Sequence, residues 1–122
     1  MGDSVITSQL RKIPTAAGWR EKLGLGVADI NAQTGTTYTL LEADLGRVIT
    51  FSNAAAIAVT IPTGLDSGFW CECFQIGAGQ VTFTAGATVN SYGGLLSLAG
   101  RYAGCTIISV AADSFVISGT MA

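Results

Sequence analysis

Carboxylate side chains are the first candidates for chemistry in this chain, because a pair of them can serve as general acid and base or as a glycosidase pair. Glu42 and Asp44 are two residues apart, so in an extended strand they would share one face. The other carboxylates that could join them lie in distant segments: Asp66, Glu72 and Asp113. The chain has no histidine. We therefore interpret residues 42–46 as a solvated turn and predict a protein that is not an enzyme and has no catalytic residues.

The three cysteines, Cys71, Cys73 and Cys105, are the next candidates, because thiolates bind metals and form disulfides. Cys71 and Cys73 are two residues apart in a predicted strand, where neighbours on one face are too far apart to bridge each other readily. A tetrahedral zinc site needs a fourth ligand, and no histidine exists to supply it. Two interpretations remain open: thiols packed in the core, or a disulfide within or between chains. Neither includes a metal or another cofactor.

The glycine-rich segment Gly77-Ala78-Gly79 invites comparison with phosphate-binding loops. It lacks the third glycine, the lysine and the following helix that such loops need. The residues after it, Val81-Thr82-Phe83-Thr84, alternate as a strand does. We therefore predict a hairpin turn at this segment and no nucleotide site.

Aromatic side chains on strands can line a sugar site or an interface between subunits. The candidates are Trp70, Phe74, Tyr92, Tyr102 and Phe115. Trp70 and Phe74 share one face of a predicted strand with Glu72 and Ile76, and the two cysteines of that strand lie on the other face. Both faces are substantially apolar, so one covers the core and the other needs a second sheet or a second subunit. We favour the subunit and keep a carbohydrate site as the alternative.

Charge is unevenly distributed along the 122 residues. Charged side chains make up 11% of the chain, against about 25% in typical domains, and half of them fall within the first thirty residues. This shift predicts an N-terminal arm, residues 1–32, followed by a β body, residues 33–122. A solitary soluble domain usually has a more charged surface, so we expect the body to pack against other copies of itself. The net charge of −2 gives no indication of a nucleic-acid or membrane partner.

Neither a secretion signal nor a membrane-spanning segment is predicted. The first twelve residues include Asp3 and no apolar stretch of the usual length. The longest uncharged run, residues 73–100, is rich in Gly, Thr and Ser and is typical of turns and strands. We therefore expect the chain to be made and folded in a cytoplasm.

The arm contains one predicted helix, at about residues 15–23. Thr15 after a proline is a suitable N-cap, and Gly24 is a natural end. Ala16, Trp19 and Leu23 then form one apolar stripe. Because so short a helix is marginal alone in water, Trp19 and Leu23 are expected to lie against the chain's own body or against another subunit.

The body is divided into short segments that alternate between apolar and polar residues or are rich in β-branched residues. About eight strands are predicted, at residues 38–41, 48–51, 57–61, 69–76, 81–85, 88–91, 105–110 and 115–118. The last two flank a four-residue turn and are expected to form a hairpin. This pattern predicts an all-β protein, and we expect a β-sandwich or jelly-roll-like body of antiparallel strands.

The body resembles a module found in virion proteins of tailed bacteriophages, including capsid decoration proteins, head fibres and tail fibres. The likeness lies in four segments in the same order: Thr36-Thr37-Tyr38-Thr39-Leu40-Leu41-Glu42-Ala43-Asp44-Leu45-Gly46-Arg47, Ala58-Val59-Thr60-Ile61-Pro62, Gln75-Ile76-Gly77-Ala78-Gly79-Gln80-Val81-Thr82-Phe83 and Ser114-Phe115-Val116-Ile117-Ser118-Gly119. Residues 19–26 also resemble the helix and Leu-Gly-Leu-Gly exit that lead into such modules. Cys71 and Cys73 depart from the pattern, because related sequences commonly have aliphatic or polar residues at these strand positions.

The resemblance implies a β-sandwich that assembles as a trimer and has no catalytic residues. We expect a structural virion protein, assembled in the host cytoplasm: a trimeric capsid decoration (cement) protein that anchors to the major capsid protein, or to other virion proteins, through its arm. A head-fibre or tail-fibre protein is the alternative, with host-glycan binding through Trp70 or Tyr92 as a further option. The candidate interface residues are Trp19, Leu23, Trp70, Phe74, Ile76 and Tyr92.

Overall fold

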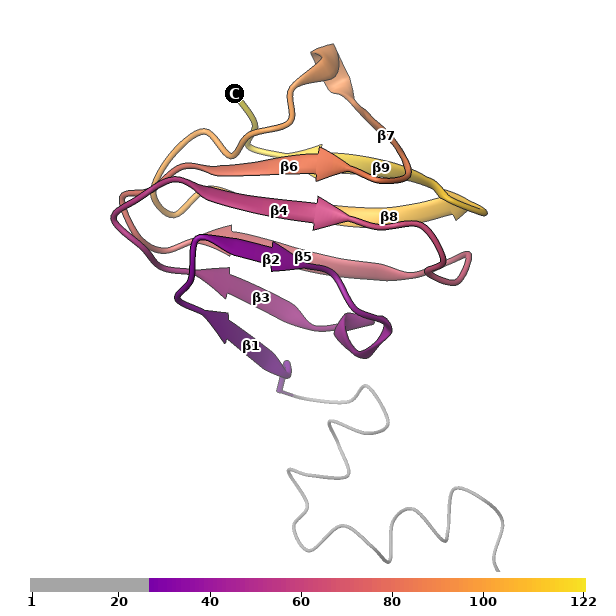
Figure 1. Ribbon diagram of the computed structural model, residues 1–122, viewed down its shortest axis with the longest axis horizontal. Helices are drawn as coiled ribbons and strands as arrows, with labels where there is room; N and C mark the ends of the chain where they lie inside the picture. Colours follow the sequence, from indigo (N-terminus) through magenta and orange to yellow (C-terminus); the bar gives the residue numbers. More distant parts are fainter. Residues whose placement is uncertain (1–26) are drawn as a thin grey trace, which may run out of the picture.

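A computed structural model describes residues 27–122 of the chain. The predicted helix at 15–23, with Trp19 and Leu23, lies outside the described residues. Figure 1 shows the strands, which are β1 (Ile30–Gln33), β2 (Thr37–Thr39), β3 (Val48–Phe51), β4 (Ile57–Ile61), β5 (Trp70–Gln75), β6 (Val81–Ala85), β7 (Thr88–Ser91), β8 (Gly104–Ala111) and β9 (Ser114–Gly119). Two single 3₁₀ turns accompany them, η1 (Glu42–Asp44) and η2 (Tyr92–Gly94).

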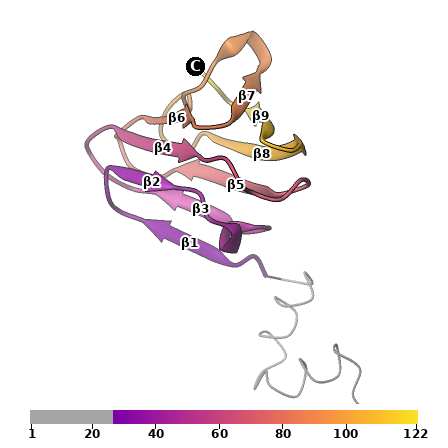
Figure 2. The ribbon, with the colours of Figure 1, turned by 45° about the vertical axis from the view of Figure 1, so that its right-hand side comes forward.

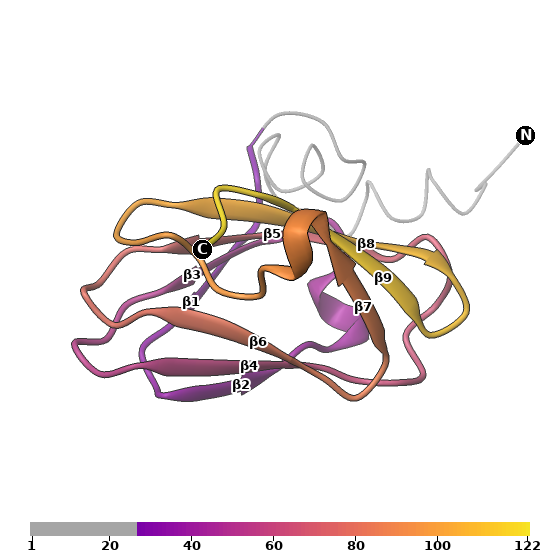
Figure 3. The ribbon, with the colours of Figure 1, turned by 90° about the horizontal axis from the view of Figure 1, so that it is seen from above.

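The strands form two sheets that face each other, as the view from above shows (Figure 3). One sheet has six strands in the order β1-β3-β5-β8-β9-β7, and the other has three in the order β2-β4-β6. From β1 to β6 the chain alternates between the two sheets, so each pair of strands makes one coil. Successive coils stack with their strands parallel and in register, for example Tyr38 beside Val59 and Val59 beside Phe83.

The all-β prediction is therefore confirmed, but the antiparallel sandwich is wrong in its strand pairing. Most pairs are parallel, and the coils stack in a solenoid-like manner. Parallel neighbours need a crossover connection, and here a strand of the opposite sheet supplies it. Alternation along a strand shows which side chains face inward, but it does not show which strand lies beside it. The predicted boundary of the arm also changes. Residues 30–32, which were expected in the arm, belong to β1 (Ile30–Gln33), the first strand of the six-stranded sheet.

The C-terminal third departs from the coiled pattern. β8 and β9 form the predicted hairpin, with Asp113 in the left-handed backbone conformation at its turn (φ 52°). β8 also pairs antiparallel with β5, which ends the series of parallel strands in that sheet. The turned view in Figure 2 shows the segment after β7 rising beyond β6 and β9. Single bridges at Ser97 and Leu98 then join this segment to β6 and to the C-terminus.

The core lies between the two sheets and consists of the inward-facing positions of nearly every strand. Its largest fully buried side chains include four phenylalanines, Phe51, Phe69, Phe83 and Phe115. Phe69 and Phe115 meet edge to face with ring centroids 6.5 Å apart, and Tyr38 meets Phe51 in the same way at 6.0 Å. Complete burial of each such side chain contributes roughly 1.5–3 kcal/mol to folding.

The segment Gly77-Ala78-Gly79 connects β5 to β6, which belong to different sheets, so the predicted hairpin turn is wrong. The segment is an arc that stacks directly on the preceding arc between β3 and β4. The amide of Gly79 donates to the carbonyl of Asn53 at 2.8 Å. Buried Gln75 fixes the arc from inside, since its Nε2 donates to the carbonyl of Gly77 and its Oε1 accepts from the amide of Val81.

Candidate functional site

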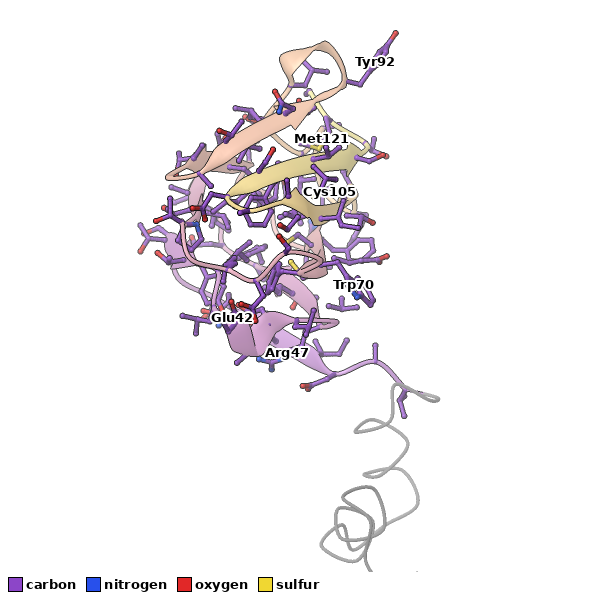
Figure 4. All side chains as sticks on the ribbon, turned by 90° about the vertical axis from the view of Figure 1, so that its right-hand side faces the viewer. Glu42, Arg47, Trp70, Tyr92, Cys105 and Met121 are labelled. Carbon is purple, nitrogen blue, oxygen red and sulfur yellow. The ribbon has the colours of Figure 1, made fainter. Side chains whose placement is uncertain are left out.

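The outer face of the six-stranded sheet carries a group of apolar side chains, four of them exposed and two half-buried. We name it the Trp70 patch and define it as Ile30, Val48, Trp70, Ile108, Val110 and Val116. The register places Trp70, Ile108 and Val116 in one row across β5, β8 and β9. Trp70 is 43% exposed and Ile108 is 40% exposed. Figure 4 shows Trp70 pointing away from the core on this face.

The predicted division of β5 into two faces is confirmed. Cys71, Cys73 and Gln75 are buried, whereas Trp70 is exposed and Phe74 is half-buried. Each outer aromatic ring lies over a glycine of a neighbouring segment. A Cβ atom on Gly104 would be 2.3 Å from the Phe74 ring, and one on Gly46 would be 3.7 Å from the Trp70 ring. The missing side chain of Gly104 therefore makes room for the Phe74 ring, whereas a Cβ at Gly46 would make only an ordinary contact with Trp70.

The candidate interface residues do not form one group. Trp70 and Phe74 lie at opposite ends of β5, and Ile76 just beyond the strand is only 36% exposed. Tyr92 is 97% exposed in η2 and projects from the far end of the body (Figure 4). Phe115, considered as a sugar-site aromatic, is completely buried in the core.

Sequence reasoning missed β8 as a source of this surface. Ile108 and Val110 alternate with buried Ile107 and Ser109, so both faces of β8 are largely apolar. The same signal that identified the outer face of β5 was present here, since an apolar residue occupies each side of the alternation.

The three cysteines are free and buried inside the body. Cys73 lies directly opposite Cys105 in the antiparallel pair of β5 and β8. Contacts with the thiols of Cys105 and Cys71, together with burial, raise the pKa of the Cys73 thiol well above its usual value. A buried, protonated thiol is a weak nucleophile and is not presented to another molecule, so this geometry favours the core-packing interpretation over a bridge between chains.

We expect none of the three thiols to react with a water-soluble disulfide reagent while the protein is folded. Burial of the sulfur atoms blocks access, and the raised pKa of Cys73 reduces the thiolate that would react. Spectrophotometric titration should count three reactive thiols after unfolding in guanidinium chloride and none before. Rapid reaction of one thiol in the native protein would contradict this placement.

Asp44 is not in a solvated turn, and this part of the prediction is wrong. Its side chain is completely buried at the end of the body where the first coil lies. Oδ2 accepts hydrogen bonds from the Tyr38 hydroxyl at 2.6 Å and from the Leu41 amide at 3.0 Å, and Oδ1 accepts from Asn31 Nδ2 at 3.0 Å. Glu42 instead is exposed and accepts a hydrogen bond from the amide of Asp66. The two carboxylates therefore do not form a catalytic pair.

Arg47 balances the charge of this buried carboxylate. Its Nη1 lies 3.4 Å from Asp44 Oδ1, and its Nε lies 3.0 Å from Asp29 Oδ2 without the alignment of a hydrogen bond. Figure 4 shows Glu42 and Arg47 at this end of the body. The network joins β1, β2, η1 and the start of β3, so it fixes the first coil to the second. We interpret it as structural, because Asp44 has no exposed surface.

The same network raises the pKa of Tyr38 to about 12, through burial first and then through its hydrogen bond to Asp44. The phenol thus stays protonated in the folded protein where an unfolded tyrosine, with a pKa of 10.0, ionises. Its stabilising contribution is complete below about pH 10 and is lost as the pH rises toward about 12. Denaturant titrations should show a steeper loss of stability over this interval for the wild type than for Tyr38→Phe. Equal slopes would contradict the assignment.

Within residues 27–122, no three acidic, cysteine or histidine side chains are grouped so as to hold a metal ion. In the same part of the chain, no helix is both long and apolar enough to cross a membrane. No protein-family model matches the chain, and a search of curated proteins found no match.

Proposed function

We propose that the protein is a structural virion component that works by self-association through the Trp70 patch. The observation that carries this proposal is the exposure of large apolar side chains on the outer face of the six-stranded sheet. Glu72 is the one charged residue in the nine strands of the described part, so charge does little to oppose contact there. Removal of the patch from water contributes roughly 25 cal/mol for each Å² of apolar area.

The outer face of the three-stranded sheet has a different character and supports the choice of surface. Its outward positions are nearly all threonine, in two rows across β2, β4 and β6: Thr37, Ala58 and Thr82, then Thr39, Thr60 and Thr84. Hydroxyl groups in these rows also bond to each other, as Thr60 does to Thr84 at 3.2 Å. A hydroxylated face keeps its contact with water at little cost, whereas Trp70 and Ile108 do not.

The preferred assembly is a trimer that decorates and stabilises a phage capsid, with residues 1–32 as the anchor to the shell. The ordered motifs that resemble phage virion modules support this choice, and so does the low charge of the body. A head-fibre or tail-fibre component is the alternative. Imaging of antibody-labelled particles distinguishes them, because a decoration protein labels the whole shell and a fibre protein labels discrete appendages.

Size-exclusion chromatography with light scattering tests the self-association. We expect the wild type to elute as a trimer at micromolar concentration and the double variant Trp70→Glu/Ile108→Glu to elute as a monomer. The added carboxylates would have to be desolvated inside the interface. Thr37→Glu/Thr39→Glu is the matched control, since it adds the same two charges to the exposed face of the other sheet and should leave the trimer intact. A monomeric wild type would overturn the proposal.

A further inference from the structure

The outer face of the six-stranded sheet is hollowed beside the Trp70 patch, where Glu72 pairs with Val48 of the patch. The depression has a volume of about 330 Å³ and is lined by Glu72, Phe74, Tyr102, Gly104, Cys105, Thr106, Ser118, Gly119 and Thr120. It crosses β5, β8 and β9, where Glu72, Thr106 and Ser118 occupy one row of the register.

Two glycines make the floor of this depression. A Cβ atom on Gly104 would lie 2.3 Å from the Phe74 ring, and one on Gly119 would lie 2.3 Å from the carbonyl oxygen of Gly104. Neither position can therefore accept a side chain without moving its neighbours. The two strands therefore approach closely at Gly119, and the Phe74 ring lies over Gly104.

Tyr102 stands at the rim in a backbone conformation that a bulky residue rarely adopts. Its φ is 70°, in the left-handed region, and its side chain is 70% exposed. The conformation is held by the Tyr102 amide, which donates to the Gln75 carbonyl at 2.6 Å. The guanidinium of Arg101 lies 5.3 Å from the ring centroid, and its Nε donates to the Ile76 carbonyl at 2.9 Å. An exposed ring on a strained backbone contributes little to the stability of the fold. Its strained position therefore points to a role in binding.

We propose that this depression binds a neutral oligosaccharide. The apolar face of a sugar ring would stack on Tyr102 beside Phe74, and the sugar hydroxyls would donate to the Glu72 carboxylate and exchange hydrogen bonds with Thr106 and Ser118. Glu72 and Thr106 are already within 3.4 Å of each other, so both can bond to one sugar unit. A neutral ligand is favoured because the carboxylate would repel a sialic or uronic acid.

A second, smaller depression indicates a chain of several sugar units. It has a volume of about 200 Å³, and it shares Ser118 and Gly119 with the first while extending past Ile117 and Met121 to Tyr92. The two depressions therefore adjoin at the end of β9. No residue belongs to both the Trp70 patch and the lining of the first depression, so separate substitutions test the two proposals.

Saturation-transfer NMR with the full chain tests the proposal, using tetrasaccharides of glucose, galactose and N-acetylglucosamine, with sialyllactose as the anionic comparison. We expect saturable binding of at least one neutral probe and weaker binding of sialyllactose. Tyr102→Ala should weaken the neutral probe at least tenfold and Tyr102→Phe should retain it. Tyr102→Asn suits the left-handed backbone, so it should keep the thermal unfolding midpoint and still lose binding. Trp70→Ala, outside the depression, should bind like the wild type.

No transfer to any neutral probe at millimolar concentration would overturn this assignment. Equal binding by Tyr102→Ala and the wild type would overturn it as well. The oligomeric state, measured by light scattering on the same samples, reports separately on the Trp70 patch, so failure of one proposal is distinguishable from failure of the other.

Discussion

Gly79→Ala should destabilise the protein by about 3 kcal/mol or more, a large part of the total stability of a domain of this size. A Cβ atom at Gly79 would lie 1.8 Å from the carbonyl oxygen of Ala55 and 2.7 Å from that of Asn53. Both are backbone atoms of the adjacent arc, so no side-chain rotation relieves the overlap. The two arcs would have to separate, which would strain the pairing of β3 with β5 and of β4 with β6.

Gly100→Ala is the matched control, since no atom lies within 4 Å of the position that its Cβ would occupy. Both glycines lie outside the strands, and neither is in the left-handed region, so the comparison isolates steric overlap from backbone freedom. Urea titrations of the two variants should differ strongly in midpoint. A Gly79→Ala variant as stable as Gly100→Ala would show that the arcs are not stacked in the way described.

Asp44→Ala should cost about 3 kcal/mol, because it removes the acceptor that several buried donors share. The Tyr38 hydroxyl, the Asn31 amide and the Leu41 backbone amide would each lose a hydrogen bond at once. Arg47 would also keep its charge with only Asp29 near it. Asp44→Asn should be less costly, since its side-chain oxygen can still accept one or two of these bonds.

Asp66→Ala provides the control for this prediction. Asp66 is an exposed acidic residue, and its removal changes the net charge by the same amount. We expect a change within about 0.5 kcal/mol, typical of surface substitutions. Thermal or urea unfolding followed by circular dichroism measures both. Equal, small effects for Asp44→Ala and Asp66→Ala would mean that the network does not hold the first coil in place.

The positions of the strands followed from local pattern. Alternation in Ile57–Ile61 and Val81–Ala85 reflects a strand with one buried and one exposed face, and that constraint is local to the chain. The same reasoning placed the cysteines of β5 inward and Trp70 outward. β1 was missed because its four residues, Ile30–Gln33, form a short strand whose polar residues are the half-buried ones and whose Ile30 and Ala32 are exposed, the reverse of the usual pattern.

Contacts between residues that are far apart in the sequence could not be predicted from local pattern. The buried position of Asp44 depends on Asn31 and Tyr38, which come from two different sheets. The depression at Tyr102 depends on glycines of β8 and β9 lying beside Phe74 of β5. In each case residues far apart in sequence meet only after the order of strands in the sheets is set.

Sequence alone determined that this is an all-β body of low charge, where eight of the nine described strands lie, and which side chains of β5 face inward, because a period of two is imposed by the backbone of a strand. Only the tertiary structure decided that the strands wind into stacked parallel coils, that Asp44 is buried, and that the outer face of one sheet divides into an apolar patch and a hollow. The reason is that the packing of whole coils determines which strands lie side by side. That packing depends at the same time on the short arcs between strands, on glycines where a side chain would overlap a neighbour, and on hydrogen bonds to buried polar groups.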